Sequence, residues 1–331
     1  MIISRTPFRI SFFGGGTDYP IWYNKNGGAV LATSFDKYCY ITVRYLPPFF
    51  DYKYRIRYYN REETKNINKI NHPAVRETLN YLKFRKGLEI QHNADLPARI
   101  GIGSSSAFTV GLLNALYALK GKMTTKRQLA QESIHIEQNI LKENVGSQDQ
   151  VSCAFGGFNK IEFNGEETFK VQPVTIKKGK IKSLQRRMML FFTGFRRTAS
   201  EIAGEQIKKT PMRKNELTRM HEMVDEAIEI LNNSDSDISD FGRLLHQTWM
   251  MKRKLTNKIS TREIDDIYKK SIEAGALGGK LLGAGGGGCL LLFVEPEKQQ
   301  KVRKKLKNLQ LIPFSFENLG SQIIYYIRDE K

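Results

Sequence analysis

Pro97-Ala-Arg-Ile-Gly-Ile-Gly-Ser-Ser-Ser-Ala107 is the most informative segment of this 331-residue sequence. Its glycines, Gly101 and Gly103, allow positive φ angles and a close approach of the backbone to a ligand. The serines that follow predict the start of a helix, where unpaired N–H groups and the helix dipole attract anions. A serine-capped helix needs only one serine, so we interpret the segment as a phosphate-binding loop. It is neither a Walker A loop nor a Gly-x-Gly-x-x-Gly fingerprint.

The periodicity of apolar residues changes at this loop. Before it, short runs rich in β-branched and aromatic residues predict strands. After Gly103, Phe108, Leu112, Ala115 and Leu119 follow helical spacing. A second helix is predicted from Thr125. The strands expected in the first part of the chain are Ile2–Phe13, Val30–Ala32, Tyr38–Val43, Gly87–His92, Phe158–Phe163, Phe169–Val174 and Met188–Phe192.

The remainder of the chain is predicted to be mostly helical. Ser260 with Glu263 resembles a capping box for a helix that ends near Gly275. Leu281–Val294 and Gln322–Ile327 are expected to form strands. We predict a domain boundary near residue 180, giving an N-terminal domain over 1–180 and a C-terminal domain over 181–331.

Composition limits the class of protein. The net charge is +19, and the basic residues are dispersed rather than interleaved with aromatic residues in a nucleic-acid motif. We therefore expect an anionic small-molecule partner, with no nucleic acid and no membrane. Three widely separated cysteines indicate neither a disulfide framework nor a zinc cluster, and a reducing cytoplasm fits best.

Three further segments carry polar or glycine-rich patterns. Arg5–Tyr19 is a strand that ends in glycines and then Thr17-Asp18. Asn144–Gln150 places Asp149 in a tight loop after a helix. Leu281–Phe293 contains five glycines in six residues between apolar runs, which suggests that its backbone passes close to another group. Taken singly, Asp18 fits a turn residue and Asp149 is unremarkable.

Together these four segments resemble, in their order and separation, the kinase superfamily of galactokinase, homoserine kinase, mevalonate kinase and phosphomevalonate kinase (GHMP). The opening segment is similar to the galactokinase motif, with Arg9, Thr17, Asp18 and Tyr19 retained and Gly15-Gly16 in place of Glu-His. The resemblance implies an α+β, two-domain fold. Its N-terminal β-α-β domain would be similar to a ribosomal-protein domain, its C-terminal α/β domain ferredoxin-like, and the active site would lie in the cleft between them.

The resemblance also implies Mg²⁺-ATP and a role for each matching residue. Asp149 would be the catalytic carboxylate and Arg9 the cation that keeps it ionised. Ser105 and Glu137 would bind magnesium, with Glu132 and Glu143 as nearby alternatives to Glu137. The residues expected to bind ATP are Pro97, Arg99, Gly101, Gly103, Ser104, Ser105, Ser106 and Ala107, and the third motif is Gly283, Gly285, Gly286 and Gly287.

Within the superfamily, the segments Ile3–Asp18 and Ser104–Tyr117 most resemble bacterial D-glycero-D-manno-heptose 7-phosphate kinases. That branch phosphorylates the anomeric C1 hydroxyl in GDP-heptose biosynthesis for capsule or lipopolysaccharide. It implies a sugar-phosphate substrate and a monomer or homodimer. Gly16, Thr17 and Asp18 are expected at the sugar, and Arg197 or Lys37 at its phosphate.

Three other functions remain open from the sequence. One is a related sugar 1-kinase acting on fucose or a hexose. Another is a catalytically silent sugar-sensing regulator on the same fold, although the retention of Asp149 and Arg9 disfavours it. A basic nucleic-acid-binding protein is permitted by the charge, but no motif supports it.

Overall fold

The computed structural model describes residues 1–165, 168–195 and 199–327. Within them, nine strands form one large sheet and four form a second. The large sheet has the order β13-β1-β2-β5-β3-β4, with β12 and β6 also pairing with β2, and β7 with β6. Its strands are β1 (Ile2–Phe13), β2 (Gly28–Tyr45), β3 (Tyr54–Arg57), β4 (Arg61–Thr64), β5 (Leu88–Ala94), β6 (Phe158–Asn164), β7 (Thr168–Pro173), β12 (Phe316–Glu317) and β13 (Gln322–Tyr326).

The second sheet is antiparallel, with the order β11-β8-β10-β9. Its strands are β8 (Met188–Phe192), β9 (Ala276–Leu281), β10 (Cys289–Val294) and β11 (Gln310–Ile312). Every residue of β10 is buried, as expected of a central strand.

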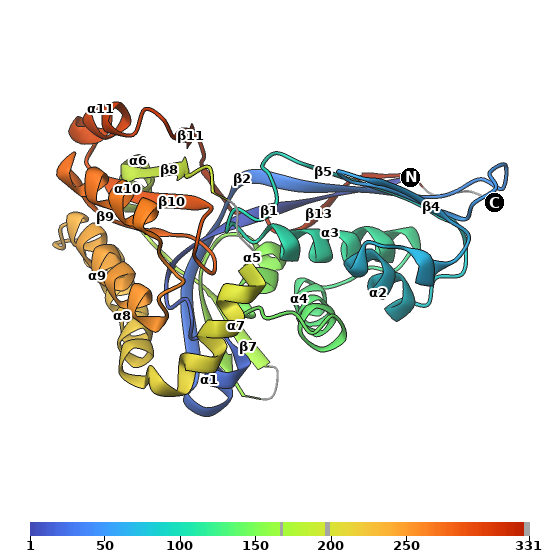
Figure 1. Ribbon diagram of the computed structural model, residues 1–331, viewed down its shortest axis with the longest axis horizontal. Coiled ribbons are helices and arrows are strands. Elements are labelled where there is room, and N and C mark those ends of the chain that lie inside the picture. The colour runs from blue at the N-terminus through green and yellow to red at the C-terminus, as the bar shows by residue number, and fades with distance from the viewer. Residues whose placement is uncertain (166–167, 196–198, 328–331) are drawn as a thin grey trace.

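Helices cover both sheets, and Figure 1 shows the two parts side by side along the long axis. On the large sheet lie α1 (Pro20–Asn26), α2 (Pro73–Tyr81), α3 (Ser104–Leu119), α4 (Lys126–Ile134) and α5 (Gln148–Phe155), with η1 (Ile67–Lys69) and the π-helix η2 (His135–Ile140). In the rest of the chain lie α6 (Lys178–Arg187), α7 (Ala199–Lys209), η3 (Thr210–Met212), α8 (Lys214–Asn232), α9 (Ser239–Leu255), α10 (Arg262–Glu273) and α11 (Pro296–Lys305).

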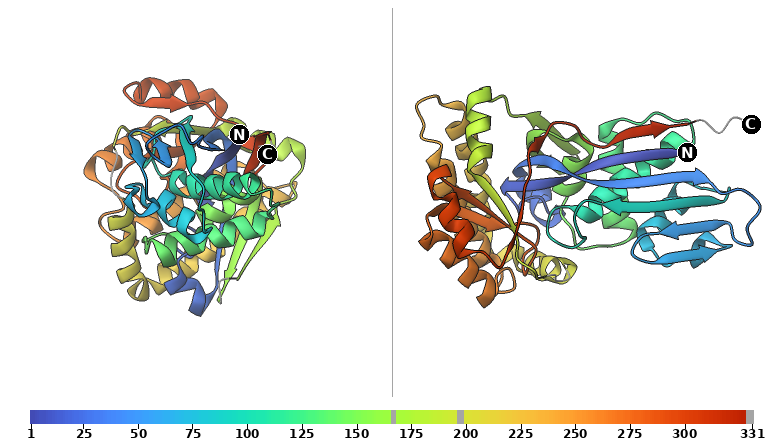
Figure 2. Two further views of the ribbon diagram at one scale, coloured as in Figure 1. Left: turned by 90° about the vertical axis from the view of Figure 1, so that its right-hand side faces the viewer. Right: turned by 90° about the horizontal axis from the view of Figure 1, so that it is seen from above.

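The chain returns to its starting sheet at its end. β13 pairs with β1, and Met1 donates a hydrogen bond to the carbonyl oxygen of Ile327 at 3.2 Å. Figure 2 shows β13 alongside β1, with β2 on the other side of β1. The division predicted near residue 180 stays a prediction, but β12 and β13, which lie beyond it, belong to the first sheet.

The predicted α+β architecture is confirmed, with local corrections. The segments Val30–Ala32 and Tyr38–Val43 are parts of one strand, β2, because residues 33–35 continue the pairing with β1 and only a bulge at Asp36 and Lys37 interrupts it. The cap of α10 is Thr261, whose hydroxyl accepts from the Ile264 N–H. Ser260 instead donates to Asp265 at 2.6 Å, so the predicted Ser260 cap is wrong. The helix predicted from Thr125 is confirmed as α4, and the Thr125 hydroxyl caps it by accepting from the Gln128 N–H.

No helix in the described part of the chain is long and apolar enough to cross a membrane. All three cysteines are buried free thiols.

Candidate active site

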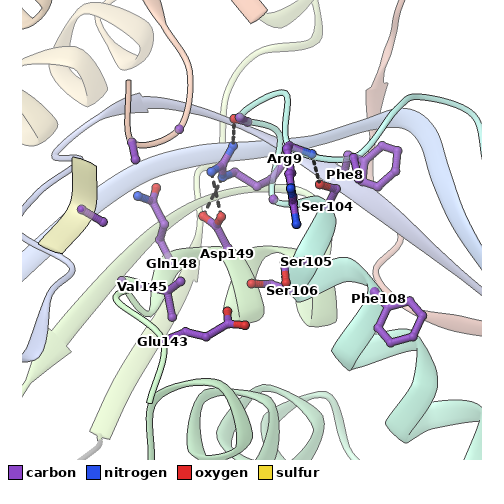
Figure 3. A pocket seen from close by; sticks show the side chains of 18 of the residues that line it. Phe8, Arg9, Ser104, Ser105, Ser106, Phe108, Glu143, Val145, Gln148 and Asp149 are labelled. Carbon is purple, nitrogen blue, oxygen red and sulfur yellow. Dashed lines mark hydrogen bonds and ion pairs between the residues drawn. The ribbon is translucent and has the colours of Figure 1, made fainter. Parts of the chain in front are cut away.

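A cavity of about 620 Å³ brings together segments that are distant in the sequence. Its walls come from β1, the loop before α3, the start of α5, α9, and the loop between β9 and β10. Figure 3 shows that the side chains of Arg9, Asp149 and the serines at the start of α3 gather within it. All four sequence motifs therefore contribute residues to this one cavity.

The phosphate-binding loop has the geometry that its sequence predicts. Gly101 and Gly103 have φ angles of 79° and 76°, in the left-handed region that glycine tolerates. Gly103 occupies the N-cap position of α3 and has no side chain with which to cap it. The Ser104 hydroxyl accepts instead from the Arg99 N–H at 3.3 Å. The first N–H groups of α3 are therefore available to an anion in the cavity.

Arg9 and Asp149 form a bidentate ion pair. Arg9 Nε and Nη2 donate to the two carboxylate oxygens at 2.7 and 2.8 Å, and Nη1 donates to the Gly101 carbonyl at 2.7 Å. The Arg9 side chain is 3% exposed and that of Asp149 is 25% exposed. Burial lowers the pKa of Arg9, but the interaction with Asp149 outweighs this effect and raises it overall. One arginine thus fixes Asp149 relative to the loop, with the carboxylate open to the cavity.

Asp18 is buried beside this pair. It accepts from the Gly16 N–H at 2.9 Å, and a Cβ on Gly146 would lie only 2.0 Å from its Oδ2 atom. Burial raises the pKa of Asp18, while hydrogen bonds from Gly16 and Gln148 oppose the rise. A buried carboxylate that lines a cavity can accept hydrogen bonds from sugar hydroxyls.

Glu137 lies behind the loop, in contact with Ser106. Its Oε2 atom accepts from the Ser106 hydroxyl at 2.8 Å and from the Gln150 amide at 2.5 Å. Its Oε1 atom is buried and has no hydrogen-bond partner among the described residues. Burial raises the pKa of Glu137 to about 7, and hydrogen bonds from Thr109, Ser106 and Gln150 limit the rise.

The free oxygen of Glu137 and the serine hydroxyls fit a hard cation such as Mg²⁺, which takes few protein ligands. No cluster of three or more His, Cys, Asp or Glu residues that could hold a metal occurs among the residues described. Of the alternatives to Glu137, Glu143 lines the cavity, whereas Glu132 accepts from the Tyr117 hydroxyl at 2.9 Å. Ser105 is exposed and lines the cavity, while Ser106 makes the contact with Glu137.

The glycine-rich third motif packs against the phosphate-binding loop. A Cβ at Gly288 would lie 2.4 Å from the Ile100 carbonyl oxygen, and the Cys289 N–H donates to that oxygen at 2.9 Å. Gly285 approaches Ile259 in the same way, at 2.7 Å. Gly283 lines the cavity. The backbone at these glycines does pass close to another group, as expected. That group is mainly the backbone of neighbouring protein segments.

Several residues predicted to bind ligands do not line the cavity. Thr17 is fully buried and its hydroxyl donates to the carbonyls of Gly14 and Ala29. Lys37 pairs with Asp36 at 3.1 Å. Arg197 lies outside the described residues. Pro97, Ala107 and Glu137 do not line it either, and of the third motif neither Gly285, Gly286 nor Gly287 does.

Two buried lysines in the cavity were not predicted. Lys252 of α9 is 4% exposed and donates to the Gly283 carbonyl, and Lys280 of β9 is 1% exposed and donates to the Phe12 carbonyl at 2.9 Å. Burial lowers the pKa of Lys252 to about 8 and that of Lys280 well below its ordinary value. Nothing in the sequence distinguishes these two among its 53 Lys and Arg residues.

An aromatic wall at the other end of the cavity was also missed. The rings of His72 and Phe108 stack at 4.7 Å, and His92 and Tyr58 contact them edge-on at 5.1 and 4.9 Å. Burial lowers the pKa of His72, and that of His92 to about 4, so both rings are neutral near pH 7. An uncharged aromatic wall suits a planar base.

Comparison with known proteins identifies the family. The model of the GHMP kinases N terminal domain matches residues 68–157, and that of the GHMP kinases C terminal domain matches residues 223–310. The chain belongs to the GHMP kinase family. It is therefore a phosphotransferase that acts on an alcohol group, and ATP is the phosphate donor in this family. The predicted two-domain GHMP fold is confirmed.

The relatives include several sugar kinases. D-glycero-alpha-D-manno-heptose 7-phosphate kinase of Campylobacter jejuni is 29% identical over 96% of this chain and 97% of its own length. The crystal structure of a putative sugar kinase from Campylobacter jejuni is 28% identical, with a TM-score of 0.71 over 98% of each chain. A D-glycero-D-manno-heptose 1-phosphate kinase from Bacteroides thetaiotaomicron shares the fold with a TM-score of 0.78, over 99% of this chain and all of its own, at 23% identity.

Proposed function

We propose that this GHMP kinase transfers the γ-phosphoryl group of ATP to the anomeric C1 hydroxyl of D-glycero-D-manno-heptose 7-phosphate. The product would be heptose 1,7-bisphosphate, an intermediate for GDP-heptose. The observation that carries the proposal is the Arg9–Asp149 pair, which faces the same cavity as the phosphate-binding loop. The similarity to the Campylobacter jejuni heptose 7-phosphate kinase, which extends over nearly the whole of both chains, supports the choice of acceptor.

The arrangement accounts for the chemistry of phosphoryl transfer. Such a reaction depends mainly on positioning and on neutralising the charge of the transferred group. Asp149 accepts the proton of the acceptor hydroxyl, a role worth about 10²–10⁴-fold in rate. Arg9 holds that carboxylate ionised and oriented through two hydrogen bonds. Asp18 accepts hydrogen bonds from the sugar, which orients its C1 hydroxyl toward Asp149.

ATP binding would use both ends of the cavity. The adenine base lies against the wall of Tyr58, His72, His92 and Phe108, and its phosphates meet the N–H groups at the start of α3. Glu137, with Ser106 or Ser105, would hold Mg²⁺, which neutralises phosphate charge when bound. The monomeric or dimeric state and the cytoplasmic location remain predictions.

A substrate panel tests this function. The purified chain is assayed with Mg²⁺-ATP against heptose 7-phosphate, fucose, galactose and mevalonate by ADP release, and ³¹P NMR locates the new phosphate. We expect kcat/KM for heptose 7-phosphate to exceed the others by about 100-fold or more, because the site recognises polar groups that the others lack. Faster turnover of fucose or galactose would replace the proposal with a sugar 1-kinase of another specificity. ATP-independent sugar binding without turnover would indicate a regulator.

A further inference from the structure

Lys252 and Lys280 place two buried amino groups in the cavity, and neither is within ion-pair distance of a carboxylate of the described residues. Each makes one hydrogen bond, to a backbone carbonyl, although an ammonium group has three donors. No ion pair involves either lysine among the described residues, within 4.0 Å. Burying an unpaired charge is costly, so a protein that keeps two of them in a cavity retains them for a ligand of opposite charge.

The space beside Gly15 is bounded by donors. A Cβ built on Gly15 would lie 3.7 Å from Ser11 Oγ, 3.9 Å from Gln148 Nε2 and 4.0 Å from Lys280 Nζ. All four residues line the cavity. Ser11 is 4% exposed, and its hydroxyl has no partner among the described residues. The position of the absent Gly15 side chain is therefore surrounded by a cation, a hydroxyl and an amide, the groups that bind a phosphate monoester.

This space lies on the acceptor side of the cavity. Lys252 contacts Gly283, which packs on the phosphate-binding loop, whereas Lys280 contacts the end of β1 beside Gly15. Of the carboxylates in the cavity, Asp18 is the one that acts on the Lys280 ammonium. Lys280 thus lies beside Gly15 and interacts with Asp18, the carboxylate expected at the sugar.

We propose that Lys280, Ser11 and Gln148 bind the phosphate group that the acceptor sugar already carries, with Lys252 between this group and the phosphates of ATP. The inference rests on the proposed function and names the part of the site that would select a phosphorylated sugar. It assigns this role to residues other than Lys37, which pairs with Asp36 outside the cavity, and Arg197, which lies outside the described residues.

The experiment compares phosphorylated and unphosphorylated forms of two acceptors in wild type and Lys280→Met. The acceptors are heptose 7-phosphate, its parent heptose, a hexose 6-phosphate and its parent hexose. Methionine has a side chain of similar length but carries no charge. We expect kcat/KM for the preferred sugar phosphate to fall by about 30-fold or more, because a buried charged partner is lost. The KM for ATP and the turnover of the parent sugar should change by about twofold or less.

Two variants and one stability measurement separate ligand binding from a structural role. Gly15→Ala fills the space without backbone strain, because the φ angle of Gly15 lies outside the left-handed region, and should lower the preference for the sugar phosphate in the same way. Lys269→Met removes a charge from the exposed face of α10 and should have no effect. The urea midpoint of Lys280→Met should equal or exceed that of wild type, because an unpaired buried charge is removed. A structural lysine would lower it.

The possible outcomes distinguish the inference from the proposed function. If wild type prefers heptose 7-phosphate but Lys280→Met loses both acceptor forms equally, or loses affinity for ATP, the inference alone fails. If the preferred acceptor is a hexose 6-phosphate and Lys280→Met removes that preference, the inference holds and the proposed substrate fails. If wild type turns over only unphosphorylated sugars, or none of the four acceptors, both are contradicted.

Discussion

Gly283 lies directly against Gly101, so that a Cβ at Gly283 would be 2.6 Å from the Gly101 Cα atom. The contact joins the loop between β9 and β10 to the phosphate-binding loop, backbone against backbone. Gly101 in turn accepts from Arg9 through its carbonyl oxygen. The position of the loop relative to the Arg9–Asp149 pair therefore depends on the absence of two side chains.

Replacing Gly283 with alanine tests that dependence. Gly283→Ala adds a Cβ where the φ angle is 73° and Gly101 is in the way, so the two loops must separate. We expect a clear rise in the KM for ATP and a loss of stability above the roughly 1 kcal/mol that a left-handed alanine costs by itself. Steady-state kinetics and urea unfolding measure both effects.

Gly121→Ala is the matched control for this substitution. Gly121 has a similar φ angle, 68°, and no atom within 4 Å of a Cβ built on it. It should show the backbone cost alone, with unchanged kinetics. Equal effects of the two substitutions would contradict a role for the contact between the loops.

Asp149→Asn removes the proposed base while preserving size. We expect kcat to fall by about 10²–10⁴-fold, because an amide cannot take up the proton of the acceptor hydroxyl. The affinity for ADP, measured by calorimetry, should be nearly unchanged. Asp265→Asn, which weakens a more exposed pair between Asp265 of α10 and Arg253 of α9, serves as the control and should retain activity. Undiminished turnover by Asp149→Asn would remove this residue from the mechanism.

Three glutamates are candidates for the magnesium site, and glutamine substitutions should rank them. Glu137→Gln keeps the hydrogen bonds from Ser106 and Gln150 but removes the charge, so the Mg²⁺ concentration for half-maximal rate should rise by about tenfold or more. Glu132→Gln should leave it unchanged, because Glu132 contacts Tyr117. A larger effect of Glu143→Gln, whose carboxylate lines the cavity in Figure 3, would transfer the role to Glu143.

The pH dependence of KM should reveal the charge on Lys252. Burial lowers its pKa to about 8, and Arg9 acts in the same direction, while Asp18 and Asp149 oppose the shift. Lys280 also faces this group. As the pH rises through about 8, the unliganded protein loses an ammonium charge, so the KM for the sugar phosphate should rise. Near pH 7 the charge is retained and the KM should be flat.

The same titration of Lys252 should make the folded protein more stable as the pH rises above about 8, although it weakens binding of the sugar phosphate. The pKa of Lys252 in the folded state lies below its ordinary value of 10.5, so the unfolded chain binds more protons between the two values. The contribution of Lys252 therefore makes the free energy of unfolding increase from about pH 8 to pH 10. Lys252→Met should abolish both effects. A KM that does not change between pH 7 and 9 in wild type would argue against Lys252 near the sugar phosphate.

The features that the sequence predicted well depend on local chemistry. Glycines at 101 and 103 adopt positive φ angles, and the helix starts at Ser104 because serine and glycine favour that boundary. The predicted strand Met188–Phe192 is confirmed as β8, and its five consecutive apolar residues suit a strand that is almost entirely buried.

The features that could not be predicted depend on contacts between distant segments. Lys280 meets Phe12 and Gly15 only because the second sheet packs against the end of β1. Ser106, rather than Ser105, contacts Glu137 because of the direction in which successive side chains leave α3. Neither contact can be predicted from the spacing of residues along the sequence or from composition. The two predicted strands Val30–Ala32 and Tyr38–Val43 are likewise joined into β2 by pairing with β1 on both sides of a bulge at Asp36 and Lys37.

The pairing of β13 with β1 places Ile2 opposite Tyr326. Because β1 also carries Arg9, the strand that supplies the active-site cation acquires its outer neighbour only from a segment far downstream in the sequence. On the ribosome, this edge of the first sheet must stay open until β13 has emerged. A chain shortened before β12 would leave the same edge of β1 exposed to pairing with other molecules.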